Sequence, residues 1–154
     1  MKIETTSCGT ATIRVGPSGE HEVLLVRPRE RQDAWGFPKG HREPNEEDID
    51  TAARETMEET GIDVVVLPER LEPVEVITKK ERKTVHIFLA YPVCGMTDLV
   101  ATEPNPQDDE NYQVAWWPVS RLPASHQYQR QLFDALRSVV TRVFSEEYEP
   151  RSRW

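Results

Sequence analysis

Residues 40–62 read GHREPNEEDIDTAARETMEETGI, and this stretch decides the fold. Glu55, Glu58 and Glu59 fall within roughly a 100° arc of one helix, because each helical residue advances by about 100°. Three like charges side by side destabilise a helix, so the cluster indicates that divalent cations neutralise it. Mg²⁺ takes carboxylate oxygens as ligands and bridges them to substrate phosphates. The stretch therefore predicts a helix that holds metal against a phosphate chain.

The spacing of this stretch resembles the signature of the Nudix family, G-x5-E-x7-R-E-U-x-E-E-x-G-U, in which U is a bulky aliphatic residue. Thr56 departs from it, since the family prefers Ile, Leu or Val there, but Thr keeps a methyl group and β-branching. An acidic helix alone is more often a solvated surface, whereas the whole spacing favours the family. The positions that match are Gly40, Glu46, Arg54, Glu55, Glu58, Glu59, Gly61 and Ile62.

The resemblance implies an α/β fold, the Nudix α/β/α sandwich with a mixed central sheet. It also implies metal-dependent hydrolysis of a phosphoanhydride bond in a nucleoside-diphosphate-linked substrate, with Mg²⁺ as the cofactor and Mn²⁺ as a substitute. A module that only binds nucleotides is disfavoured, because none of the glutamates of the signature is lost.

Composition sets bounds on this reading. The chain has 154 residues, a formal net charge of −8 and a mean hydropathy of −0.65. We expect one Nudix domain over residues 1–144 and a polar tail over 145–154. The negative charge argues against a surface that grips nucleic acid, so we expect no stable nucleic-acid complex.

The chain also lacks the marks of a membrane or secreted protein. No apolar run approaches the roughly 18 residues of a membrane span, and the N-terminal residues lack the apolar core of a signal peptide. Two cysteines, Cys8 and Cys94, fit a reducing compartment. We therefore expect a cytoplasmic protein without a membrane partner, which acts as a monomer or small homo-oligomer on a small nucleotide.

Hydrophobic periodicity predicts the elements around the signature. Alternating residues predict a strand over 11–15, and the continuous apolar run 23–26 predicts a short buried strand that forms a hairpin with it. The helix is predicted to begin near Glu46, to end at Gly61 and to leave its glutamates outside. Its inward face is predicted to consist of Ile49, Ala52, Ala53, Thr56 and Met57. Further strands are predicted over 64–67, 74–78, 84–91 and 114–117, and a closing helix over 125–144. The strand over 84–91 is predicted to place Val85, Ile87, Leu89 and Tyr91 on one face.

The resemblance also implies roles for the residues of the signature. Arg54 is expected to point away from the carboxylates and to pair with Glu46, which makes its role structural. Glu55 and Glu59, at i and i+4, are the first choices for metal ligands, and the Gly40 carbonyl is expected to add one. Glu58 either binds a second metal or takes the proton of the attacking water.

A further acidic ligand is expected from a later loop, as members of this family often use one. Glu110 is the candidate. The alternative is that Glu110 is one more solvated acid in the acidic run 108–110.

The flanking residues resemble those of asymmetric diadenosine tetraphosphate hydrolases. Residues 35–44, WGFPKGHREP, are similar to their W-x-x-P-K-G-H-x-E-P run. Residues 82–85, RKTV, resemble their K-P-K-T-V segment, and Glu110 to Trp116 matches an E-x5-W segment. Diadenosine tetraphosphate, cleaved to ATP and AMP, is therefore the predicted substrate.

Such a substrate needs contacts beyond the metal cluster. Lys39, His41 and Lys83 are predicted to hold the remaining phosphates, although each lysine could be a solvated surface residue and His41 a turn residue. An adenine needs a stacking face, for which Tyr128, Tyr112 and Tyr91 are candidates. Core packing is the alternative for each tyrosine.

Other Nudix pyrophosphohydrolases remain rivals. They act on diphosphoinositol polyphosphates, nucleoside triphosphates or RNA 5′ ends. The first group carries a similar W-x-x-P-K-G run, but it needs a more basic pocket than a net charge of −8 suggests.

Overall fold

The structure is a computed structural model that describes residues 1–29, 34–93, 112–124 and 128–143. Glu110, the acidic run around it and the predicted tail 145–154 lie outside these ranges. The strands are β1 (Ile3–Val15), β2 (His21–Pro28), β3 (Lys39–His41), β4 (Val64–Arg70), β5 (Val74–Ile77), β6 (Glu81–Pro92) and β7 (Tyr112–Pro118). The helices are α1 (Asp48–Thr60), the short 3₁₀ helix η1 (Val119–Arg121) and α2 (Tyr128–Val143).

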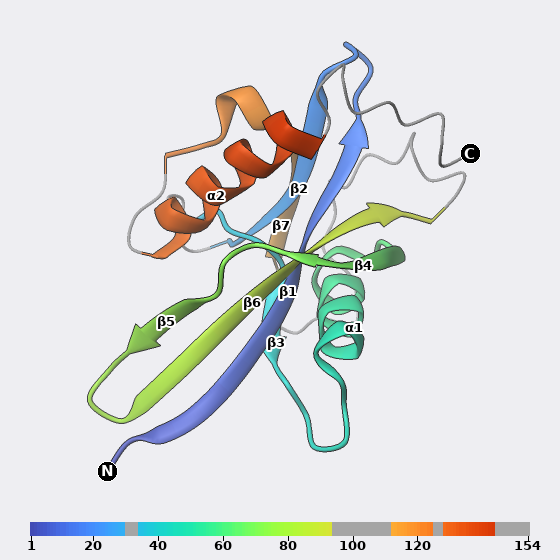
Figure 1. Ribbon diagram of the computed structural model, residues 1–154. Helices are drawn as coiled ribbons and strands as arrows, with labels where there is room; N and C mark the ends of the chain where they lie inside the picture. The colour runs from blue at the N-terminus through green and yellow to red at the C-terminus, as the bar shows by residue number, and fades with distance from the viewer. Residues whose placement is uncertain (30–33, 94–111, 125–127, 144–154) are drawn as a thin grey trace.

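Strand β1 is the centre of a mixed sheet of order β4-β6-β1-β2-β7 (Figure 1). Along one edge it runs parallel to β6, from Ile3 opposite Glu81 to Thr12 opposite Ala90. Along its other edge it pairs first with β3 and then with β2, both antiparallel. The predicted hairpin of β1 and β2 is confirmed, but β1 begins eight residues earlier than the pattern of residues 11–15 suggested. The pairing with β6 and β3 supplies backbone partners for this additional length.

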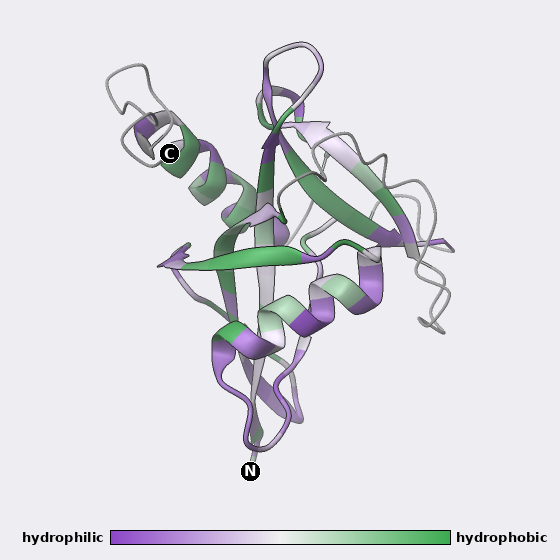
Figure 2. Cartoon of the chain, turned by 90° about the vertical axis from the view of Figure 1, so that its right-hand side faces the viewer, coloured by the Kyte–Doolittle hydropathy of each residue, from purple (hydrophilic) through white to green (hydrophobic). Residues whose placement is uncertain are grey.

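The two long helices cover opposite faces of the sheet, as Figure 1 shows. Ala11 and Ile13 of β1 lie in one apolar cluster with residues of α2, whereas Cys8 lies in another with Ala52 of α1. Successive residues of a strand point to opposite faces, so this alternation places the helices on the two sides. The predicted α/β/α sandwich is therefore confirmed. Figure 2 shows hydrophobic strands behind α1 and a hydrophilic loop leading into it.

Helix α1 begins at Asp48, two residues later than predicted. Asn45 adopts a positive φ of 71°, and Glu47 is the N-cap, with a reciprocal capping box to Asp50. The predicted end is confirmed, because Gly61 takes φ 74° and its N–H bonds to Met57 O at 2.8 Å. A residue with a side chain rarely adopts this left-handed conformation.

The predicted inward face of α1 is wrong at both ends. Ile49 and Met57 are each 38% exposed. Glu59 was expected outside with the other glutamates, but it is only 7% exposed. The helix is rotated relative to the apolar pattern because hydroxyl groups make the contact with the sheet. The buried residues of α1 are Thr51, Ala52, Thr56, Glu59 and Thr60.

A chain of buried hydroxyls joins α1 to β1. Thr56 Oγ1 donates to Ala52 O at 2.8 Å and lies 2.8 Å from Thr10 Oγ1, which lies 2.8 Å from Thr12 Oγ1. A hydroxyl carries one proton, so Thr12 donates to Thr10 and Thr10 donates to Thr56. The hydroxyl of Thr56 thus joins α1 to β1 from the position where the Nudix signature has a bulky aliphatic residue.

The remaining elements follow the sequence with small shifts. Residues 64–70, 74–77, 81–92, 112–118 and 128–143 form the predicted strands and closing helix. Val85, Ile87 and Leu89 are buried on one face as expected, but Tyr91 is 46% exposed because the apolar cluster under α2 ends at Leu89. No helix within the described residues has the length and apolar character needed to cross a membrane.

Replacing Thr56 by Val tests the hydroxyl chain. We expect Thr56→Val to lower the free energy of unfolding by about 1 kcal/mol, since Thr10 loses its acceptor inside the protein. This corresponds to a fall of roughly 3 °C in melting temperature for a chain of this size. Thr141→Val is the matched control, because Thr141 Oγ1 makes the same bond to the carbonyl four residues earlier at an exposed position. An unchanged or higher melting temperature for Thr56→Val would show that the hydroxyl chain gives no net stabilisation.

Candidate active site

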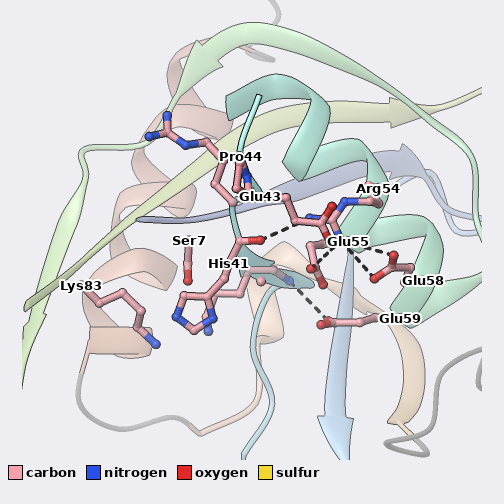
Figure 3. Close-up of a pocket in the computed structure, with 12 residues that line it drawn as sticks. Ser7, His41, Glu43, Pro44, Arg54, Glu55, Glu58, Glu59 and Lys83 are labelled. Carbon is pink, nitrogen blue, oxygen red and sulfur yellow. Dashed lines mark hydrogen bonds and ion pairs between the residues drawn. The ribbon is translucent and has the colours of Figure 1, made fainter. Parts of the chain in front are cut away.

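A cleft of about 570 Å³ opens between the end of β3, the helix α1 and the strand β6 (Figure 3). It gathers most of the residues that the sequence singled out, although it excludes Tyr128, and Glu110 lies outside the described residues. Its lining residues are Ser7, Lys39, Gly40, His41, Arg42, Glu43, Pro44, Arg54, Glu55, Glu58, Glu59 and Lys83.

The wall formed by α1 presents the three glutamates of the Nudix signature. A Cβ at Gly40 would collide with the carboxylate atoms of Glu55, so any larger residue at this position would displace that carboxylate. Glu59 Oε1 accepts a hydrogen bond from Lys39 N at 3.3 Å. Glu58 is the most open of the three, with 48% of its side chain exposed. The acidic wall thus rests directly on the backbone of residues 39–40.

Arg54 pairs with Glu46, but the expectation that it points away from the carboxylates is wrong. Its Nε and Nη2 donate to the two oxygens of Glu46 at 2.7 and 2.9 Å. Its Nη1 donates to Glu55 at 3.0 Å and lies 3.3 Å from both oxygens of Glu58. Nη2 also reaches His41 O at 3.2 Å. One guanidinium therefore joins the loop, the end of β3 and two acids of α1, because its five donors fan out in a plane.

These contacts shift the pKa values of both partners. The hydrogen bond from Arg54 is the main reason that the pKa of Glu46 falls to about 2, with further bonds from the Glu43 backbone and Thr51. The bond to Glu46 likewise raises the pKa of Arg54 above its ordinary value. Both groups are therefore charged throughout the physiological range of pH.

The oxygens of this wall suit a hard cation. Three carboxylates and the adjoining Gly40 backbone supply the kind of donors that Mg²⁺ takes. Across the described ranges, no three acidic, histidine or cysteine side chains enclose a metal position as they stand. Arg54 bonds to carboxylate oxygens of Glu55 and Glu58 in this arrangement. Metal ligation by these residues stays a prediction.

The other side of the cleft carries the predicted cations. Figure 3 shows His41 between the glutamates and Lys83. Lys39 Nζ lies 5.5 Å from the ring centroid of Tyr128, which places that tyrosine beside the phosphate-binding candidates even though it does not line the cleft. Tyr128 is half-buried and packs against the main core.

Sequence reasoning missed some residues of this region. Ser7 lines the cleft because it pairs with His41 across β1 and β3, a register that the strand predicted over 11–15 did not include. Arg42 and Pro44 also line it, and both lay within the flanking run without an assigned role. Glu81 bonds to His41 from β6, and only the strand register brings them together.

Comparison with known proteins settles the family. The family model described as the NUDIX domain matches residues 9–136 of this chain. The chain belongs to the Nudix family. The matched region includes the whole signature and every described residue that lines the cleft except Ser7.

Individual Nudix proteins show similarity of different extents. The asymmetrical bis(5′-nucleosyl)-tetraphosphatase of Rattus norvegicus is 40% identical over 72 residues, 45% of this chain and 49% of that protein. The mRNA-decapping enzyme subunit 2 of Arabidopsis thaliana is 33% identical over 108 residues, 70% of this chain and 27% of that protein. The matches thus span about half or less of the length of these relatives.

Among solved structures, a binary complex of a C. elegans Ap4A hydrolase superposes with a TM-score of 0.60 at 24% identity. The superposition covers 92% of this chain and 95% of that one. At this identity the likeness shows the Nudix fold and leaves the substrate open.

The low pKa of Glu46 predicts an acid-sensitive contribution to stability. A carboxyl with a lower pKa in the folded protein stabilises it above the ordinary pKa of 4.5, and this contribution is lost as the pH falls toward 2. We expect Glu46→Gln to melt at a lower temperature than wild type at pH 7 and the two melting temperatures to converge near pH 2. Glu69→Gln, at an exposed position of β4, is the control that should follow wild type. Parallel melting temperatures for Glu46→Gln and wild type across this range would contradict the assignment.

Proposed function

We propose that this chain hydrolyses a phosphoanhydride bond in a nucleoside-diphosphate-linked substrate. One observation carries the proposal: a single cleft has the acids of the Nudix signature on one wall and Lys39, His41 and Lys83 on the other. A polyphosphate needs both, because its charge must be offset along its length while one phosphorus is attacked.

We assign metal ligation to the acidic wall. Glu55 and Glu59 are the first ligands, the Gly40 carbonyl adds a backbone oxygen, and Glu58 and Glu110 are the further candidates. Bound Mg²⁺, for which Mn²⁺ substitutes, supplies charge neutralisation of the phosphates and a lowered pKa for water. Arg54 keeps Glu46 and Glu55 in place and so positions this wall.

We propose that Glu58 accepts the proton of the attacking water. Its carboxylate is the most exposed of the three and so the most accessible to solvent water. The alternative role, ligation of a second metal, uses the same oxygens.

We further propose diadenosine tetraphosphate as the substrate, with ATP and AMP as products. The contact between Lys39 and Tyr128 supports this choice, because it sets a phosphate-binding cation beside an aromatic ring. Stacking of a base on such a ring contributes roughly 1–3 kcal/mol. The acidic wall lies at one end of the phosphate path and the cations lie along the remainder, so attack falls off-centre.

Hydrolysis at an RNA 5′ end is the second candidate. The similarity to a plant mRNA-decapping subunit covers 70% of this chain and favours it. Diphosphoinositol polyphosphates and nucleoside triphosphates are the other substrates of the same chemistry. We propose a cytoplasmic enzyme that acts as a monomer or small homo-oligomer, and the free, buried Cys8 fits a reducing compartment.

Conservative changes in the acidic wall test the chemistry. We expect Glu58→Gln to lower kcat by roughly 100-fold or more, because proton transfer by a positioned base contributes at least this much. Glu59→Gln should lower activity similarly, and a chelator should abolish activity in wild type. Glu69→Gln, outside the cleft, is the control with wild-type rates. Near-full turnover in both Glu58→Gln and Glu59→Gln would remove this helix from the mechanism.

The products test the substrate. We expect diadenosine tetraphosphate to give ATP and AMP, and reaction in H₂¹⁸O to label the AMP alone, since water attacks the phosphorus nearest one adenosine. The measurement is mass spectrometry of products from a panel that also contains nucleoside triphosphates, capped and triphosphorylated RNA and diphosphoinositol phosphates. Two molecules of ADP as products would contradict the substrate assignment. Faster cleavage of another substrate in the panel than of diadenosine tetraphosphate would contradict it too. Neither result would contradict the phosphoanhydride chemistry.

A further inference from the structure

An acid stands at the cationic end of the cleft. Glu81 Oε2 accepts a hydrogen bond from Thr5 Oγ1 at 2.6 Å and lies 3.3 Å from His41 Nε2. Its side chain is 30% exposed. Glu81 does not itself line the cleft, but His41 does, so Glu81 sits on the rim.

The strand register places Glu81 beyond Lys83. Both residues lie on β6 two positions apart, so their side chains leave the same face of the sheet about 7 Å from each other along the strand. Thr5, which pairs with Lys83 in the register, reaches along β1 to bond with Glu81. A phosphate chain that starts at the acidic wall and passes His41 and Lys83 therefore meets Glu81 next.

Glu81 is held in its charged form. The bond from Thr5 and then the contact with His41 lower the pKa of this carboxyl. A phosphate placed near it would be repelled, because like charges a few ångströms apart repel even where water screens them. Along β6, Lys83 would therefore attract a phosphate, and Glu81, two residues away on the same face, would repel one.

We propose that Glu81 limits the length of the phosphate chain that the cleft accepts. It is a specificity-determining residue: it disfavours chains that extend past Lys83, and its contact with His41 keeps that side chain at the rim. This inference rests on the proposed function, because it assumes that the cleft binds a linear polyphosphate.

A graded series of charges at position 81 tests the inference. Glu81→Gln removes the charge at nearly constant volume, and Glu81→Lys reverses it. Glu75→Gln is the matched control, because exposed Glu75 pairs with Thr84 and so lies on the opposite face from Lys83. The probes are linear inorganic tripolyphosphate and hexapolyphosphate, with dissociation constants from titration calorimetry in Mg²⁺ buffer.

We expect the preference for the longer chain to rise by about five-fold in Glu81→Gln, which corresponds to about 1 kcal/mol at 1.4 kcal/mol per tenfold change. The preference should rise further in Glu81→Lys and stay at the wild-type value in Glu75→Gln. The increases in the two Glu81 variants should shrink in about 1 M salt, where the Debye length is about 3 Å. Thermal melts check that each variant is folded. If Glu81→Lys is not folded, the result for Glu81→Gln alone tests the inference.

An unchanged ratio of the two dissociation constants in folded Glu81→Gln would overturn the inference, as would an equal loss of affinity for both chains. The kcat/KM values for diadenosine tetraphosphate and hexaphosphate are measured beside the titrations. If wild type cleaves neither nucleotide, the proposed substrate fails, while the polyphosphate titrations still decide the role of Glu81.

Discussion

The double hydrogen bond between Arg54 and Glu46 is the interaction on which the cleft depends. Glu46 precedes helix α1 and Arg54 lies in its second turn, so the bond folds the loop back onto the helix. The same guanidinium reaches His41 O, which fixes the end of β3 against the helix. Bidentate bonds of this kind are both stronger and more directional than single ones. They add to the hydrogen bond from Lys39 N to Glu59 and to the pairing of β3 with β1, which also hold residues 39–40 against α1.

This arrangement also resolves the electrostatic problem posed by the sequence. Three glutamates on one helical arc repel each other, and the sequence suggested metal as the remedy. In the structure, Arg54 already offsets part of that repulsion through Glu55 and Glu58. Arg54 therefore contributes to holding these acids side by side. A protein with a net charge of −8 can still gather cationic side chains at one end of this cleft, where we propose that phosphate binds.

Local patterns predicted the parts of the fold that local forces decide. Gly61 as the helix end and the burial of Val85, Ile87 and Leu89 on one face of β6 follow from backbone conformation and alternation, and both are confirmed. The spacing of the signature predicted the acids of the cleft. The inward face of α1 could not be read the same way, because threonine hydroxyls satisfied by one another pack there instead of apolar groups.

The parts that sequence could not give are those set by pairing between distant strands. The length of β1 depends on β6, and the contact of His41 with Glu81 depends on the register of three strands. No periodicity in residues 3–9 or around Glu81 indicates either. The orientation of Arg54 was missed for a related reason: one guanidinium bonds to several partners, whereas the resemblance assigned it one.

The parallel pairing of β1 with β6 also has a kinetic consequence. The acidic wall comes from one short stretch of chain, but Thr5 meets Lys83 only after residues 78 positions apart have found each other. Closing so long a loop costs chain entropy before any contact repays it, and such topologies fold slowly. The helix with its acids can form early, whereas Lys83 takes its place beside the acidic wall only when β1 and β6 pair. By the roles proposed above, the chain would acquire its affinity for cations before its affinity for phosphate during folding.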